Sequence, residues 1–223
     1  MVRIVSISQS VKERAHCMSK SKSGKIKQNK ASISRQEILN VAAKMMRDVG
    51  YSHMSLRDLA QKVDMKAGSL YYHFSSKDAL VGEVMRIGVD IVSSAVIEEL
   101  QTLPTETASH DRVLAAMHIH LRTLLSASDF SSAHIRCYPF VPEAVRQKLL
   151  DHRRSYDRIW TDLLTSHIRA SNHKLTKEEQ QAKVRHLRHA ILGALNWSLE
   201  WFDEDRDDIQ AYVASLEPLL GAR

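Results

Sequence analysis

SLRDLAQKVDMKAGSLYYHFSSKDAL, residues 55–80, is the stretch that decides the fold of this chain. Its first half repeats apolar residues at i, i+3, i+4 and i+7, which predicts a helix with one buried face. The residues of that face are Leu56, Leu59, Ala60 and Val63. Ser55 followed three residues later by Asp58 is typical of a helix N-terminus. After a short interruption, a second helix buries Leu70 and Phe74 on one side.

The other side of this second helix has no apolar stripe. It carries Lys66, Ser69, Tyr71, Tyr72 and His73. A short helix with an apolar back and a front of hydroxyls, rings and a cation suits the major groove of DNA. We expect Lys66, Ala67, Gly68 and His73 to approach bases or the edge of the groove. Ser55 and Ser69 could donate hydrogen bonds to phosphates. The alternative is that Tyr71 or Tyr72 packs into the core instead.

Residues 34 to about 84 resemble the N-terminal domain of TetR-family transcriptional regulators. The likeness lies in the order of a small hydroxyl residue, an LxxLA helix, a Gly-containing turn, Y-x-H-F and a Ser-Lys pair. It covers roughly a quarter of the chain, and the remainder matches the family only in length and helical content. The resemblance implies that Tyr71, Tyr72 and Lys77 contact phosphates.

The whole chain predicts an all-α fold, because Gly and Pro are few (7 and 4 of 223 residues) and the apolar period is helical. We expect three parts: a flexible basic arm over 1–33, a helix-turn-helix domain over 34–80, and a helical effector-binding and dimerisation domain over 81–223. A capping box at Ser34 opens the first helix and Gly50 ends it. Further helices are expected over 76–100, 109–126, 130–137, 142–170, 176–202 and 209–220.

Positive charge is concentrated in the arm. Residues 1–33 contain eight Lys and Arg against one acidic residue, so the remaining chain sums to −1 of the total +6. A basic arm beside a DNA-reading unit is a candidate phosphate contact, and a solvated leader is the alternative. Met18 opens a Lys- and Ser-rich run, so translation could also start there.

Several classes of protein are disfavoured. Cys17 and Cys137 lie too far apart in sequence to suggest a disulfide, which fits a reducing cytoplasm. The first residues, MVRIVSISQSV, are too short and too interrupted by Ser and Gln to suggest the apolar region of a secretory leader, and no apolar run reaches about 18 residues. It lacks GxSxG, a Gly-rich phosphate loop and HExxH, so we expect neither an enzyme nor a cofactor nor a metal site. An enzyme or small-molecule carrier with a fortuitous helix-turn-helix is the rival reading.

A single helix-turn-helix domain contacts only a few base pairs, which is too little to select one site in a genome. We therefore expect a homodimer, which doubles the number of base pairs contacted. In the resembled family, the last two helices form the dimer interface. The corresponding candidates are Leu195, Leu199, Tyr212, Val213 and Leu216, although these stripes could instead close the monomer's own core.

The resemblance also implies a ligand cavity in the second domain. Amphipathic residues inside apolar helices are the candidates for its lining: Arg136, Tyr156, Trp160, His189, Asn196, Trp197 and Trp201. Each is also a common type of core or interface residue. The run LGALNWSLEWF from Leu192 is similar to TetR members that sense acyl-CoA thioesters, whose phosphates would meet Arg136, Arg153 or Arg185.

The sequence therefore predicts a dimeric, ligand-responsive regulator that binds double-stranded DNA. We expect a repressor that a hydrophobic or acyl-CoA-type effector releases from a palindromic operator. An activator or an effector-independent DNA binder is the alternative.

Overall fold

The computed structural model describes residues 26–125, 129–171 and 175–221, with side chains from residue 35 onward. The predicted all-α fold is confirmed, and the described residues contain no strand. Contacts divide the chain into two units, residues 1–36 and 37–223, and α3 to η3 lie in the second unit. The predicted arm lies largely outside the described residues, as does Met18.

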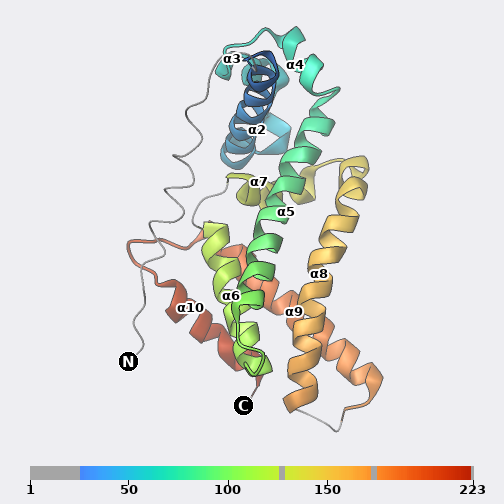
Figure 1. Ribbon diagram of the computed structural model, residues 1–223, viewed down its shortest axis with the longest axis vertical. Coiled ribbons are helices and arrows are strands. Elements are labelled where there is room, and N and C mark those ends of the chain that lie inside the picture. Colours follow the sequence, from blue (N-terminus) through green and yellow to red (C-terminus); the bar gives the residue numbers. More distant parts are fainter. Residues whose placement is uncertain (1–25, 126–128, 172–174, 222–223) are drawn as a thin grey trace. The chain divides into compact units, whose positions relative to one another are not determined.

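Helices account for nearly all of the described chain (Figure 1). In chain order they are α2 (Ile26–His53), α3 (Leu56–Lys62), α4 (Ala67–His73), α5 (Lys77–Thr102), α6 (Ser109–Leu125), α7 (Asp129–Cys137), η1 (Tyr138–Phe140), α8 (Glu143–Ser171), α9 (Lys177–Trp197), η2 (Ser198–Glu200), α10 (Ile209–Leu216) and η3 (Glu217–Leu220), where η marks a 3₁₀ helix.

Three helix ends differ from the predictions. The last helix, predicted over 209–220, ends as α10 at Leu216, and the chain continues as η3. Helix α2 begins at Ile26 instead of Ser34, since the intervening Lys, Gln and Ala residues favour a helix and contain no Gly or Pro. Helix α9 ends at Trp197, and the chain tightens into η2 where the sequence predicted a helix to Phe202. Gly50 breaks α2 as predicted, because its φ of 76° is a conformation that glycine adopts easily.

The first apolar core joins the N-terminal helices to the centre of the chain. It contains Met46 of α2, Leu70 of α4 and Val84 of α5, together with Cys137 of α7 and Val145 of α8. Buried apolar area is the main favourable term in folding, so α7 and α8 stabilise the helix-turn-helix segment directly. The first apolar core therefore crosses the predicted boundary between residues 34–80 and residues 81–223.

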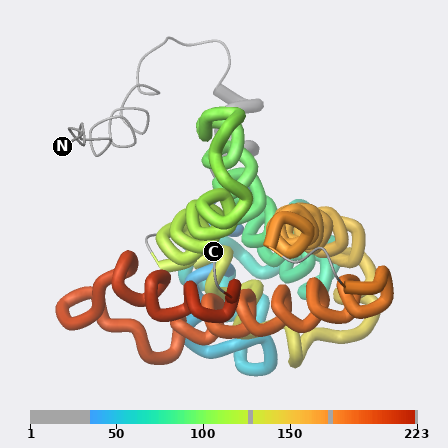
Figure 2. Tube along the Cα trace, turned by 90° about the horizontal axis from the view of Figure 1, so that it is seen from below, coloured from blue at the N-terminus to red at the C-terminus, as the bar shows by residue number. Residues whose placement is uncertain are grey.

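The second core fills the space between α6, α8, α9 and α10. Met117, Trp160, Ile191 and Val213 contribute one residue from each of these helices. Figure 2 shows α9 and α10 as a layer below α6 and α8. Helix α5 contacts α6, α7 and α8, so it runs from the helix-turn-helix segment into the second core.

Candidate functional site

The segment α3–turn–α4 is built by local signals. Ser55 Oγ accepts a hydrogen bond from the Asp58 amide at 3.1 Å, which is the predicted N-cap. The turn contains Asp64 in a left-handed conformation with φ 52°. Helix α4 is anchored by Leu70 and Phe74, which are buried as predicted.

The exposed face of α4 is rich in hydrogen-bonding groups. Tyr71 is 58% exposed and Tyr72 is 86% exposed, so neither packs into the core. The four predicted residues at the start of this face are also exposed: Lys66, Ala67, Gly68 and Ser69. His73 is half-buried, and its ring meets that of Tyr72 edge-on, with centroids 5.4 Å apart. The hydrogen-bond donors and aromatic rings of this face are therefore available for a contact outside the chain.

Lys77 opens α5 beside this face and also takes part in the fold. Its Nζ lies 4.2 Å from the centroid of the Tyr51 ring, and burial lowers the pKa of Lys77. The Tyr51 hydroxyl donates to Asp78 Oδ1 at 2.9 Å. These contacts hold the Lys77 ammonium near the junction between α4 and α5, where the sequence predicts a phosphate contact.

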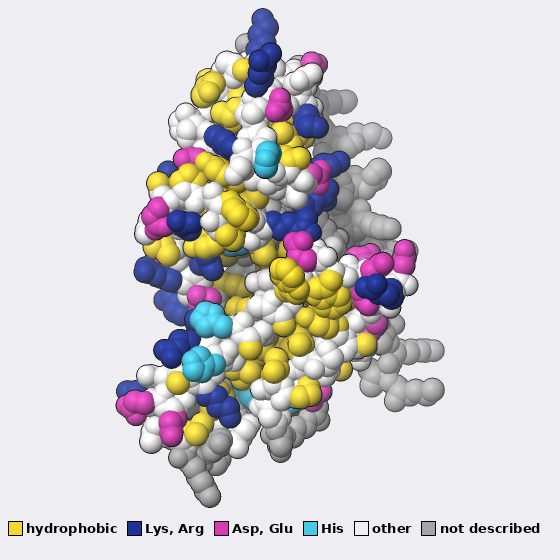
Figure 3. Space-filling view, turned by 180° about the vertical axis from the view of Figure 1, so that it is seen from behind, with side chains coloured by type: hydrophobic (Ala, Val, Ile, Leu, Met, Phe, Trp, Pro, Cys, Tyr) yellow, Lys and Arg dark blue, Asp and Glu magenta, His cyan; other side chains and the backbone are white. Residues whose placement is uncertain are grey.

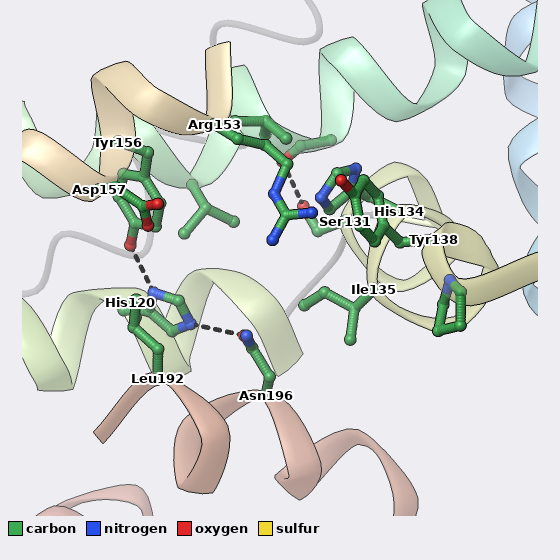
Figure 4. A pocket seen from close by; sticks show the side chains of 14 residues that line it. His120, Ser131, His134, Ile135, Tyr138, Arg153, Tyr156, Asp157, Leu192 and Asn196 are labelled. Atoms are coloured by element: carbon green, nitrogen blue, oxygen red, sulfur yellow. Dashed lines mark hydrogen bonds between the residues drawn. The ribbon is translucent and has the colours of Figure 1, made fainter. Parts of the chain in front are cut away.

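A cavity of about 200 Å³ lies between α5, α6, α7, α8 and α9 (Figure 4). Its lining combines apolar residues with several polar side chains: Gly88, Val89, Val92, His120, Ser131, His134, Ile135, Tyr138, Pro139, Arg153, Tyr156, Asp157, Leu192 and Asn196. An apolar hollow with a few convergent polar groups is the usual form of a small-molecule site.

One wall of the cavity is a hydrogen-bonded group centred on His120. His120 Nε2 donates to the Asn196 amide oxygen at 3.1 Å, because that oxygen can only accept. His120 Nδ1 then accepts from the Tyr156 hydroxyl. Burial lowers the pKa of His120 to about 4, and the Asn196 bond opposes this only in part. This wall is therefore uncharged near neutral pH, and burial also raises the pKa of Tyr156.

Charged side chains also line the cavity. Arg153 places its guanidinium carbon 3.8 Å above the centroid of the Tyr138 ring. Asp157 lies one helical turn further along α8 and lines the same cavity. Burial, followed by the nearby positive charge of Arg153, lowers the pKa of His134 to about 3, so this ring is also neutral.

A second, more open hollow adjoins the cavity. It has a volume of about 470 Å³ and shares Ile135, Pro139 and Asn196 with the cavity. We call it the outer groove. Its remaining lining residues are Arg136, Gly193, Trp197 and Glu200.

The structure separates the predicted effector residues. Tyr156 and Asn196 line the cavity, whereas Arg136 and Trp197 line the outer groove with Asn196. Trp160 is buried behind the cavity wall, with its ring edge-on to those of His120 and Tyr156. His189 and Trp201 line neither hollow and are exposed.

The predicted interface residues are largely turned inward. Leu195 and Val213 are buried in the chain's own core, and Leu199, Tyr212 and Leu216 are half-buried. The Tyr212 hydroxyl donates to the Ala194 carbonyl at 2.9 Å, and this fixes α10 against α9. The large exposed hydrophobic residues in this part of the chain are instead Trp197, Trp201 and Leu219. Figure 3 shows a broad gathering of hydrophobic side chains on one face.

Sequence reasoning missed His120, His134, Tyr138 and Asp157 as cavity residues. The available signal was weak: His120 falls on the same helical face as Met117, Leu121 and Leu124, which is the buried face of α6. A polar residue such as His120 on an apolar helix face is a candidate cavity residue. Its hydrogen-bond partners lie on other helices, so the sequence does not identify them.

Among residues 35–125, 129–171 and 175–221, no group of three or more His, Cys, Asp or Glu side chains is arranged to hold a metal. No helix in the described part of the chain is long and apolar enough to cross a membrane.

Comparisons with known proteins agree on one family. Residues 38–84 match the family described as bacterial regulatory proteins, tetR family, and residues 106–213 match a tetracyclin repressor-like C-terminal domain. The repressor KstR2 of Mycolicibacterium smegmatis is 43% identical over 56 residues, which cover 25% of this chain and 27% of that protein. KstR2 of Rhodococcus jostii is 35% identical over 94 residues, covering 35% and 46%. These matches therefore span less than half of the curated relatives' length.

Solved structures resemble the fold over most of its length. AibR in complex with isovaleryl coenzyme A and operator DNA aligns with a TM-score of 0.70 at 18% identity, covering 83% of this chain and 97% of that one. KstR2 of Mycobacterium tuberculosis aligns with a TM-score of 0.65 at 20% identity, covering 84% and 93%. At such identities the likeness establishes the fold alone.

Proposed function

The chain belongs to the tetR family of bacterial regulatory proteins, as its sequence predicted, and we propose that it is a ligand-responsive DNA-binding repressor. In this proposal a homodimer binds a palindromic operator, and a hydrophobic or acyl-CoA-type molecule releases it. One observation carries the proposal: α4 is held by two buried anchors and presents two highly exposed tyrosines.

The exposed face of α4 fits a groove of DNA. Large aromatic side chains are normally buried, so two of them exposed on a short helix favour a contact outside the chain. Their hydroxyls can donate to phosphate oxygens, which positions the helix. Lys77 at the N-terminus of α5 adds a positive charge where the helix dipole also attracts an anion.

Release by a ligand is supported by the position of the cavity. Gly88, Val89 and Val92 of α5 line it, and α5 begins directly after α4. A ligand that fits better when α5 is tilted would spread the two reading helices of a dimer out of register. It must bind that state more tightly, since equal affinity for both states shifts no population.

The relatives bear on the choice of effector. The AibR structure contains an acyl-CoA, isovaleryl coenzyme A, together with operator DNA. By analogy we propose an acyl-CoA or another compact apolar acid derivative as effector here. The exposed tryptophans Trp197 and Trp201 are our further candidates for the dimer contact, in addition to the five residues predicted from the sequence.

Fluorescence anisotropy with the palindromes upstream of the chain's own gene tests the DNA proposal. Tyr71→Ala and Lys77→Ala should each weaken binding by roughly tenfold or more, as expected for lost phosphate contacts. Lys148→Ala, an exposed lysine on α8, is the matched control and should bind like the wild type. Tight binding by the Tyr71 and Lys77 variants would reject this interface.

A further inference from the structure

Three arginines were candidates for an anion on the effector, and the structure distinguishes between them. Arg136 is already engaged: its Nε lies 3.0 Å from Glu200 Oε1, and its NH2 donates to the Leu199 carbonyl at 2.7 Å. Arg185 is exposed and lines neither hollow. Only Arg153 of these three lines the cavity.

Arg153 takes part in none of the ion pairs in the described part of the chain. Asp157, four residues further along α8, lines the same cavity, but none of the ion pairs between described residues joins it to Arg153. At a spacing of four residues, a cation before an anion is the less favourable order for an ion pair on a helix. The guanidinium therefore keeps its charge available inside the cavity.

Stacking on Tyr138 fixes the guanidinium without using its N–H groups. The guanidinium carbon is 3.8 Å from the ring centroid, so the group covers the aromatic face. Its donors are arranged in a planar fork that matches a carboxylate or phosphate. Figure 4 shows the group projecting into the space between α8 and the helices opposite, with no hydrogen bond to the residues drawn.

Arg153 is also the one lysine or arginine among the described cavity-lining residues. The two histidines of the lining, His120 and His134, are neutral near pH 7 because burial lowers the pKa of each. A partly buried charge without a counter-ion is costly, and a bound anion would remove that cost.

We propose that Arg153 is the anion anchor of this cavity, and that its ligand joins a carboxylate or phosphate group to a compact apolar body. The body would lie against Val89, Val92 and Leu192. The cavity of about 200 Å³ is smaller than a typical ligand pocket of roughly 300–1,000 Å³, so a longer ligand must extend into the outer groove. The proposal deepens the effector part of the proposed function and rests on it.

Isothermal titration of the full chain with matched probes tests this anchor. The probes are straight-chain acids of about four to eight carbons, sized to the cavity, with their CoA thioesters and their methyl esters. The variants are Arg153→Met, which keeps the length and removes the charge, and Arg153→Lys, which keeps the charge. Arg154→Met is the matched control, since Arg154 is exposed and does not line the cavity.

We expect Arg153→Met to bind the anionic probes on the order of 10- to 100-fold more weakly, as for a lost charged hydrogen bond. Arg153→Lys should fall between it and the wild type. The uncharged methyl esters should bind all variants alike, and Arg154→Met should match the wild type throughout. Tight binding of the free acids alone would assign a carboxylate to Arg153, whereas tight binding of the thioesters alone would assign a phosphate.

The proposal is overturned if no anionic probe binds the wild type, or if Arg153→Met binds the anions unchanged. It is also overturned if that variant loses the esters and the anions equally, since this would indicate a structural role. DNA affinity measured on the same proteins without probe separates the two proposals. A wild type that binds no palindrome contradicts the DNA-binding function, whatever the result for Arg153.

Discussion

Replacing Gly88 by alanine tests how closely α5 and α7 approach each other. A Cβ at this position would lie 2.3 Å from the Phe130 carbonyl oxygen and 2.8 Å from its carbon. Both are backbone atoms, so they cannot turn aside as a flexible side chain can. Ser131 Oγ also donates to the Gly88 carbonyl at 3.2 Å, so α7 is held at this place. The methyl group therefore requires α7 to move.

The magnitude follows from two opposing terms. Alanine in place of glycine inside a helix stabilises by about 1 kcal/mol. Overpacking a close contact costs about 1–3 kcal/mol, and losing the Ser131 hydrogen bond costs about 1 kcal/mol more. We expect Gly88→Ala to lower the free energy of unfolding by about 1–3 kcal/mol.

Gly82→Ala is the matched control, because Gly82 lies on the same helix and has only Val145 Cγ1 near it, at 3.8 Å. This is an ordinary contact, so the control should gain up to about 1 kcal/mol. With a gain of about 1 kcal/mol in the control, the two variants should differ by about 2–4 kcal/mol, or roughly 4–16 °C in Tm for a chain of this size. Thermal and urea unfolding of both proteins measure the difference. A Gly88→Ala protein as stable as Gly82→Ala would refute the close approach of α7.

Three further predictions concern stability. The pKa of His120 falls from 6.5 to about 4 on folding, so the unfolded chain binds more protons between these values. The contribution of His120 should therefore be complete above pH 6.5 and fall by up to about 3 kcal/mol as the pH falls towards 4, beside a loss of the same sign from His134, whose pKa falls to about 3. In urea unfolding, His120→Gln should reduce the pH dependence by its own share, and the exposed control His186→Gln should leave it unchanged. Thr176→Ala removes the capping box of α9 and should cost about 1 kcal/mol by thermal unfolding, and an unchanged Tm would contradict that role. Asp129→Asn removes a partly exposed ion pair with Arg47 and should cost less than about 1 kcal/mol, with a smaller loss at high salt.

The helix-turn-helix segment was predictable because its signals are local. Ser55 caps the helix that follows it, as the sequence indicated, and Ser76 and Thr176 cap their helices in the same way. Leu70 and Phe74 are four residues apart, so one helical turn places them on the same buried face. Such features depend on neighbours within one or two turns, and the sequence contains those neighbours in order.

The cavity was not predictable in the same way. His120 on α6 bonds to Tyr156 on α8 and to Asn196 on α9, and no spacing in the sequence relates these three residues. Tyr156 and Asn196 were predicted as cavity residues only because they are amphipathic residues on apolar helices. His189 and Trp201 were predicted on the same ground, but they do not line the cavity. The same limit applies to Leu195 and Val213, since an apolar stripe does not reveal whether it faces the chain's own core or a second copy.

Helix α7 gives the ligand proposal its physical basis, because this nine-residue helix contacts the cavity and α2 at once. His134 and Ile135 line the cavity, while Asp129 pairs with Arg47 and the Cys137 thiol donates to the Met46 carbonyl at 3.4 Å. A helix this short is rigid through its backbone hydrogen bonds, so a ligand that displaces its cavity side must also strain the contacts with α2. Gly88→Ala imposes a similar strain without any ligand. The free-energy cost of this strain determines how much more tightly a ligand must bind the state with α7 displaced than the undisplaced state. Each 1.4 kcal/mol of strain requires about a tenfold preference. If α7 is the link, Gly88→Ala should therefore weaken operator binding in the absence of ligand, whereas Gly82→Ala should leave it unchanged.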